Sequence, residues 1–173
     1  MAYSQHLKCI QAGVDAWNAW RKENPRSMPD LSNADLSGMD LSAALLRRTN
    51  FNGANLADAD LHGVDLNHCN FFGANLSNAN LRGALLRGAE LSHAELLGAL
   101  LHEACFEDAT LNNVNLREQY LHGGNFRNAN LLGSNLSEAD LSLADLYGAI
   151  SYTSCPGHHN TQPARSAIIA IPR

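Results

Sequence analysis

Residues 71–90 read FFGANLSNANLRGALLRGAE, with leucine or phenylalanine at positions 71, 76, 81 and 86. The same five-residue spacing runs without exception from Leu31 to Leu146, through 24 consecutive positions. An α-helix turns about 100° per residue, so this spacing would scatter the leucines around all its sides. A strand alternates with period two, so an odd spacing would send successive leucines to opposite faces. A backbone that turns within every five-residue unit can point all of them at one axis, as in a solenoid.

The other columns of the repeat support a coiled backbone. Alanine fills 15 of the 23 positions that lie two residues before a Leu or Phe between 34 and 144. Asp or Asn fills 16 of the 24 positions immediately before one. Asp, Asn and Gly form turns and are poor residues for helices and strands. Each unit therefore places a small residue inside, a polar turn former next, a large residue inside and two polar residues outside.

The phenylalanines predict how many units make one coil. Phe51 and Phe71 are 20 residues apart, and so are Phe106 and Phe126. Aromatic rings pack well on one another, and a coil of four units would stack each pair. We therefore expect an all-β solenoid with square coils over residues 31–150.

The motif A-[DN]-L-x-x stands intact at residues 34–38, 54–58, 74–78 and 139–143. These tandem units resemble the pentapeptide-repeat family over about residues 31–150. The resemblance implies a right-handed quadrilateral β-helix with four repeats per coil, and 24 repeats then give about six coils. The family includes proteins that protect or inhibit DNA gyrase by resembling duplex DNA in shape and charge. This chain departs from them, because its repeats are unbroken by loops and its C-terminal segment contains prolines where their dimers are joined by helices.

Both ends of a β-helix expose unpaired edges and apolar core, so they need covers. In residues 1–30, Leu7, Ile10, Val14 and Trp17 follow helical spacing. We expect a capping helix over residues 4–23, with Ser4 as N-cap, that lays Ile10, Val14 and Trp17 on the first coil. A membrane-binding or partner-binding helix is the alternative.

The repeat fails at Ser151, and residues 151–173 form a separate tail. Proline recurs there at positions 156, 163 and 172, which excludes a long helix. Two outcomes stay open for this irregular segment: Ile168, Ile169 and Ile171 fold back over the last coil, or the tail is partly disordered.

The sequence shows no signal peptide and no apolar run long enough for a membrane span. Its four cysteines have neither zinc spacing nor a dense disulfide pattern. We expect a cytoplasmic protein that does not bind membranes, and a monomer is favoured.

Charge is unequal among the four faces of a 20-residue coil. Residues 31–150 hold 14 acids and 6 arginines, and nine of these acids fall on two adjacent faces against only Arg82 and Arg117. This acidic side is a candidate surface for a basic protein partner, although a solvated face that aids solubility explains it too. Its acids are Asp35, Asp40, Asp58, Asp60, Glu95, Glu103, Glu118, Glu138 and Asp140.

Two smaller features also lie on the outside. Leu97, Leu100 and Tyr120 are predicted to form an apolar patch, which can mark a contact surface. His62, His102 and His122 share one column with Glu103 beside it, a poor metal site, so a solvated histidine ladder is the favoured interpretation.

The sequence predicts no cofactor and no catalytic residues, because a filled rod offers no pocket in which reactive groups converge. It contains no basic stripe for direct nucleic-acid binding. We expect a non-catalytic scaffold for protein interaction, with a DNA-mimicking topoisomerase inhibitor as the alternative.

Overall fold

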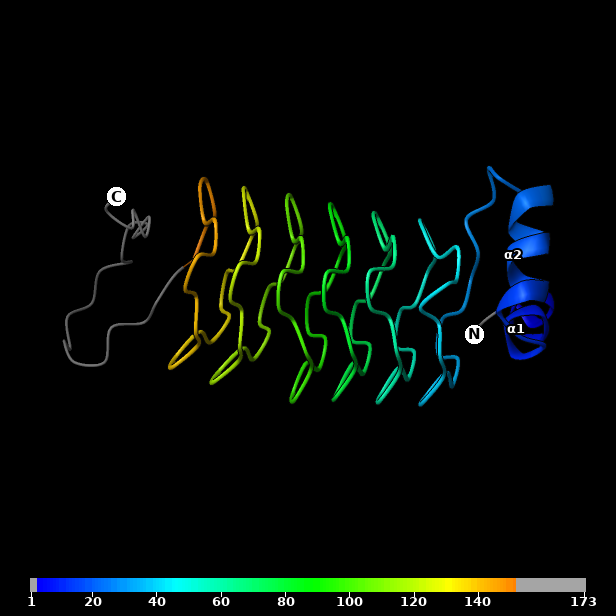
Figure 1. Cartoon of the computed structure of the whole chain (residues 1–173), viewed down its shortest axis with the longest axis horizontal. Helices are drawn as coiled ribbons and strands as arrows, with labels where there is room; N and C mark the ends of the chain where they lie inside the picture. The colour runs from blue at the N-terminus through cyan, green and yellow to red at the C-terminus, as the bar shows by residue number, and fades with distance from the viewer. Residues whose placement is uncertain (1–2, 152–173) are drawn as a thin grey trace.

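The computed structural model describes residues 3–151, and the expectations for the tail, including Ile168, Ile169 and Ile171, lie outside the described residues. Two short helices, α1 (Ser4–Gln11) and α2 (Val14–Glu23), lie at one end of a rod of stacked coils (Figure 1). No helix among residues 3–151 is long and apolar enough to cross a membrane.

Parallel β-bridges define the coil. Each joins residues 20 positions apart, from Asp30↔Asn50 at one end to Asn130↔Ile150 at the other. The predicted coil of four units is therefore present in the backbone. The bridges are isolated rather than joined into long strands, because a two-residue turn follows each Leu or Phe.

The turn chemistry explains the polar columns. The second turn residue has a positive φ in almost every unit, for example Asn78 (59°) and Gly83 (63°). Gly, Asn and Asp tolerate this left-handed conformation best. The Asp or Asn before each Leu accepts a hydrogen bond from the backbone amide two residues on, as Asn75 Oδ1 does from Ser77 at 2.9 Å. The Asp and Asn side chains thus stabilise the turn at each corner of the coil.

The core consists of the Leu/Phe column and the small column before it. Leu31 to Leu131 are buried at every fifth position, and the alanines between them are buried as well. Phe51 stacks on Phe71 with ring centroids 5.0 Å apart, and Phe106 stacks on Phe126 at 4.9 Å. The stacking predicted from the phenylalanine spacing is confirmed.

The N-terminal helix prediction was wrong in two details. The segment breaks at Gly13, whose φ of 111° no other residue adopts easily, and so two helices form in place of one. Ser4 is not the N-cap; Tyr3 occupies that position without a side-chain hydrogen bond. Ile10 and Trp17 are fully buried and Val14 packs against the core, as the helical spacing predicted.

Side chains of α2 bind the first coil directly. Trp17 Nε1 and Arg21 Nε each donate to Leu45 O at 3.1 Å. Asn18 binds both sides of the same segment, donating to Ala43 O and accepting from Leu45 N–H, each at 2.8 Å. These contacts replace the backbone partners that a preceding coil would supply.

Candidate interaction surface

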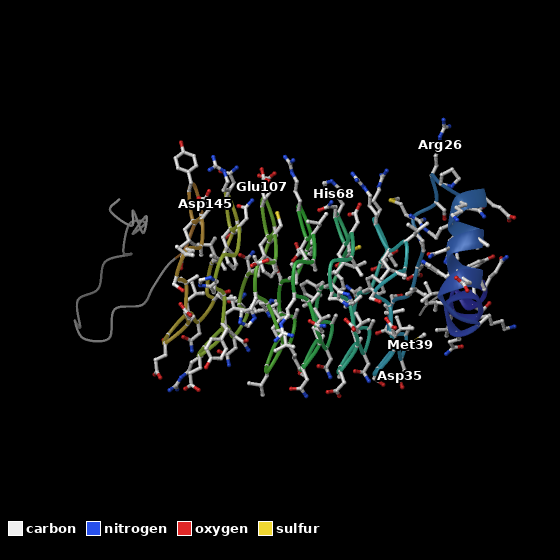
Figure 2. The ribbon with its side chains drawn as sticks, in the orientation of Figure 1. Arg26, Asp35, Met39, His68, Glu107 and Asp145 are labelled. Carbon is white, nitrogen blue, oxygen red and sulfur yellow. The ribbon has the colours of Figure 1, made fainter. Side chains whose placement is uncertain are left out.

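The acidic side and the opposite side of the rod are distinct. Figure 2 shows Asp35 on the lower edge, whereas His68, Glu107 and Asp145 lie along the upper edge. The nine predicted acidic residues follow columns that run the length of the rod, and all are exposed except Asp60, which is half-buried. The structure therefore spreads them over an extended surface and does not gather them in one pocket.

Hydrogen bonds favour the ionised form of some of these carboxylates. The Ser37 hydroxyl donates to Asp35 Oδ1 at 2.8 Å, and the Ser42 hydroxyl donates to Asp40 Oδ1 at 2.7 Å. These bonds hold the pKa of both carboxyl groups below the ordinary value, because they favour the charged acceptor. His62 lowers the pKa of Asp60 in the same way, through a 2.9 Å contact between Nδ1 and Oδ1.

Ion pairing differs between the two sides. On the other two faces of the rod, Arg87 lies 3.2 Å from Asp108, and Arg127 lies 2.9 Å from Asp145. On the acidic side Arg117 binds Glu118 and Glu138, each at 3.0 Å. Among residues 3–151, Glu95 and Glu103 have no ion-pair partner. The acidic side thus keeps uncompensated negative charge.

The predicted apolar patch lies within this acidic side. Leu97 is 71% exposed and Tyr120 is 64% exposed, whereas Leu100 is half-buried. The ring of Tyr120 stacks on His102 with centroids 5.9 Å apart.

The histidine column does not form a site in the described structure. Among residues 3–151, no group of three or more His, Cys, Asp or Glu is placed to hold a metal ion. His62 binds Asp60, His122 contacts Ser142 Oγ at 2.8 Å, and His102 stacks on Tyr120. Each histidine therefore has a separate neighbour.

One buried residue beneath this surface makes a contact between coils that the sequence did not suggest. Gln119 occupies the inward column where alanine is usual, is 7% exposed, and donates through Nε2 to Leu96 O at 2.9 Å. It was visible in the sequence as an exception to the alanine column. The pattern gave no sign that this side chain lies between two coils.

Comparison with known proteins places this architecture in a family. Eight copies of the pentapeptide-repeat family model match residues 30–67, 69–108, 79–118 and 115–150. No curated protein matches the chain significantly.

Several solved structures are similar to the chain. HetL, a pentapeptide repeat protein involved in heterocyst differentiation regulation in the cyanobacterium Nostoc, is 32% identical over 72% of this chain and 64% of its own, with a TM-score of 0.29. A pentapeptide repeat protein from the Arabidopsis thaliana thylakoid lumen is 34% identical over 62% of this chain and 64% of its own, with a TM-score of 0.35. The chain thus spans less than two thirds of either protein.

A trypsin-treated form of QnrB1, a plasmid-mediated fluoroquinolone resistance protein, has a TM-score of 0.50 with 22% identity over 71% of this chain and 77% of its own, which supports a shared fold. Pentapeptide-repeat proteins form right-handed quadrilateral β-helices, and the 20-residue bridge register agrees with that architecture. Because the family's repeats match across residues 30–67 and 69–150, this chain belongs to the pentapeptide-repeat family.

Proposed function

We propose that this protein is a non-catalytic scaffold whose acidic side binds a basic protein partner. The observation that carries the proposal is the unequal charge: nine acids against Arg82 and Arg117 on two adjacent faces. Arginines offset much of the negative charge on the other two faces through Arg87 and Arg127. Complementary charge steers association and selects partners.

A rigid rod supports such a role. We take residues 31–150 as about six coils, residues 1–30 as the N-terminal cap and connector, and residues 151–173 as a separate tail. The hydrogen bonds from Trp17, Asn18 and Arg21 to the first coil support the capping role of α2. A capped rod of fixed register holds its surface side chains in place, so a partner meets a preorganised surface.

The absence of catalysis is part of the proposal. The titratable side chains of the acidic side project outward from a core filled by Leu, Phe and Ala. Catalysis requires convergent groups in a site that excludes water. The described cysteines Cys9, Cys69 and Cys105 are free thiols, which agrees with a reducing compartment such as the cytoplasm.

A charge-matched comparison tests the interaction. One variant changes Asp35, Asp58, Asp60, Glu95 and Glu103 to Asn or Gln, and the control changes Asp65, Glu90, Glu107, Asp108 and Asp145 on the other two faces in the same way. Affinity capture from the native cell, quantified for the wild type and both variants, is the measurement. We expect a partner that only the first variant loses, and equal retention or equal loss with both variants contradicts recognition by the acidic side.

A DNA-mimicking inhibitor or protector of DNA gyrase is the second candidate. It draws support from the acidic side and from the fold shared with QnrB1, a fluoroquinolone resistance protein. A gyrase supercoiling assay in the presence of micromolar protein, with and without a fluoroquinolone, tests it. A DNA mimic changes the extent of supercoiling or of drug-induced cleavage, and unchanged activity in both arms removes this candidate.

A further inference from the structure

The β-ladder between successive coils is open at two places in residues 30–151. Elsewhere between Leu31 and Leu131, the amide of each Leu or Phe of the repeat column donates to the residue 19 positions on, as Leu76 N–H does to Glu95 O at 2.8 Å. At the first opening, Leu46 N–H has no such bond, and there the chain from Ala43 to Arg47 is held by α2. These α2 contacts go to the carbonyls of Ala43, Leu45 and Arg47, and none of them reaches the Leu46 amide.

The second opening lies between residues 94–101 and residues 115–120. The bridges expected there, Glu95 with Asn115 and Leu100 with Tyr120, are missing from an otherwise regular series. The backbone amides without their usual inter-coil partners belong to Leu96, Gly98, Leu101, Asn115 and Tyr120. The ladder closes again at both sides, where His93 N–H donates to Asn112 O and Glu103 N–H donates to His122 O, each at 3.0 Å.

Gln119 accounts for this second opening. Its buried side chain donates to Leu96 O across the two coils, where alanine would leave room for the coils to meet. Figure 1 shows the green and yellow coils diverging along the lower edge of the rod while they remain evenly spaced along the upper edge. Among residues 3–151, the amides of Leu96, Gly98, Leu101, Asn115 and Tyr120 have no other hydrogen-bond partner, and Gly98, Asn115 and Tyr120 are exposed residues.

The side chains around the second opening combine the two surfaces predicted separately from the sequence. Leu97, Leu100 and Tyr120 supply its apolar part, and Leu97 and Tyr120 are largely exposed. Glu95 and Glu103 lie on the residues 94–103 side, exposed and without ion pairs in the described structure. Unpaired strand edges bind extended peptides through backbone hydrogen bonds, and the flanking side chains select the sequence.

We propose that the second opening binds a short extended segment of a partner protein, rich in arginine or lysine and carrying apolar side chains. The segment adds to the open ladder as a strand, its amides and carbonyls pairing with the backbone of residues 94–101 and 115–120. Its basic groups meet Glu95 and Glu103, and its apolar side chains contact Leu97, Leu100 and Tyr120. This inference locates, within the proposed acidic interaction surface, the place where a partner is held.

The probe is a fluorescent synthetic peptide that alternates arginine and valine over seven residues, measured by anisotropy with the full-length protein. A second peptide has the same sequence with its valine amides N-methylated, which removes backbone donors and keeps the charge. We expect the N-methylated peptide to bind about tenfold more weakly, since a few net hydrogen bonds are at stake. Equal binding of the two peptides would overturn strand addition and leave only charge attraction.

Gln119→Ala is the decisive variant, because it restores the alanine column and changes no surface charge. Amide hydrogen exchange on the unliganded protein should show new protection at Leu96, Leu101 and Tyr120, and the probe should bind about tenfold more weakly. The double variant Glu95→Gln with Glu103→Gln should also bind the probe about tenfold more weakly. The control, Asp35→Asn with Asp40→Asn at the far end of the acidic side, should leave its affinity within about twofold.

The outcomes separate this inference from the proposed function. Loss of binding in both charge variants, with Gln119→Ala unaffected, supports a general acidic surface and overturns the local site. Binding that appears only after removal of residues 152–173 makes the tail the occupant and overturns a partner segment. The wild type could also self-associate in a concentration-dependent way that Gln119→Ala abolishes. That result makes a second copy of the chain the occupant and also overturns a partner segment.

Discussion

At the residue scale, inward positions that are equivalent in the sequence repeat differ in the space around them. Gly124 stands in the alanine column, so the pattern predicts that Gly124→Ala stabilises the protein. A Cβ on Gly124 would lie 2.8 Å from Cε2 of Phe126 and 3.1 Å from Leu121 O. The Phe126 ring, which stacks on Phe106, already fills the space of that methyl group.

We expect Gly124→Ala to lower the free energy of unfolding by about 1–3 kcal/mol, the usual cost of overpacking a filled core. Phe126→Leu in the Gly124→Ala background should remove this penalty, because the clash is with the ring. Urea unfolding of the wild type, both single variants and the double variant gives the coupling energy. Additive effects, or a more stable Gly124→Ala protein, would contradict the steric argument.

Cysteine reactivity also depends on position in the coil. Cys69 is 1% exposed, and its thiol donates to Leu46 O at 3.0 Å. Burial raises the pKa of Cys69 to about 12, so almost no thiolate is present at neutral pH. We expect iodoacetamide to leave Cys69 unmodified in the native protein and to alkylate it in urea, as measured by peptide mass mapping. Alkylation of native Cys69 at the rate seen in urea would show that the coil opens there.

At the scale of elements, a buried cation is one of the α2 side chains that bind the first coil. Arg21 is 9% exposed and donates to Leu45 O, Ser27 O and Arg47 O at 3.0–3.1 Å. The methionine in Arg21→Met keeps an apolar stem but leaves these carbonyls without the guanidinium. We expect a loss of about 2–3 kcal/mol in the free energy of unfolding.

Lys22→Met is the matched control, because Lys22 is the exposed neighbour of Arg21 on the same helix. Its unfolding free energy should stay within about 0.5 kcal/mol of the wild type. Hydrogen exchange should also show that Arg21→Met deprotects α1 and α2 before the later coils. Uniform deprotection of the whole rod would mean that α2 and the coils unfold as one unit.

The elements also show what the sequence can and cannot predict. The five-residue spacing and the phenylalanine pairs predicted the register of 20, because both depend only on residues that point to one axis. The helix break at Gly13 was missed, although glycine in mid-helix was a signal. The opening beside Gln119 could not be predicted, since it arises from two chain segments more than 20 residues apart that meet only in the folded coil. The acidic and apolar candidate surfaces were named separately, and the structure places the apolar patch among the acids.

At the scale of the whole molecule, the carboxylates of the corners link stability to pH. Hydrogen bonds from Ser37, Ser42 and Ser142 lower the pKa of Asp35, Asp40 and Asp140 below the ordinary 3.8. A carboxyl group with a lower pKa in the folded state stabilises the fold when it is ionised. That contribution is complete above the unfolded value and is lost as the pH falls through the folded value.

We therefore expect the unfolding free energy contributed by these groups to be constant between about pH 7 and pH 5 and to fall below about pH 4. The triple variant Asp35→Asn, Asp40→Asn and Asp140→Asn should show a shallower acid dependence. Asparagine still accepts the backbone amide at this corner, as Asn55 does from Ala57 at 3.2 Å, so the turns persist while the titration is removed. Urea unfolding at a series of pH values, for the wild type and the triple variant, measures both slopes. Parallel acid dependence in the two proteins would show that other groups, such as the carboxylates paired with Arg87 and Arg127, govern the acid stability of the rod.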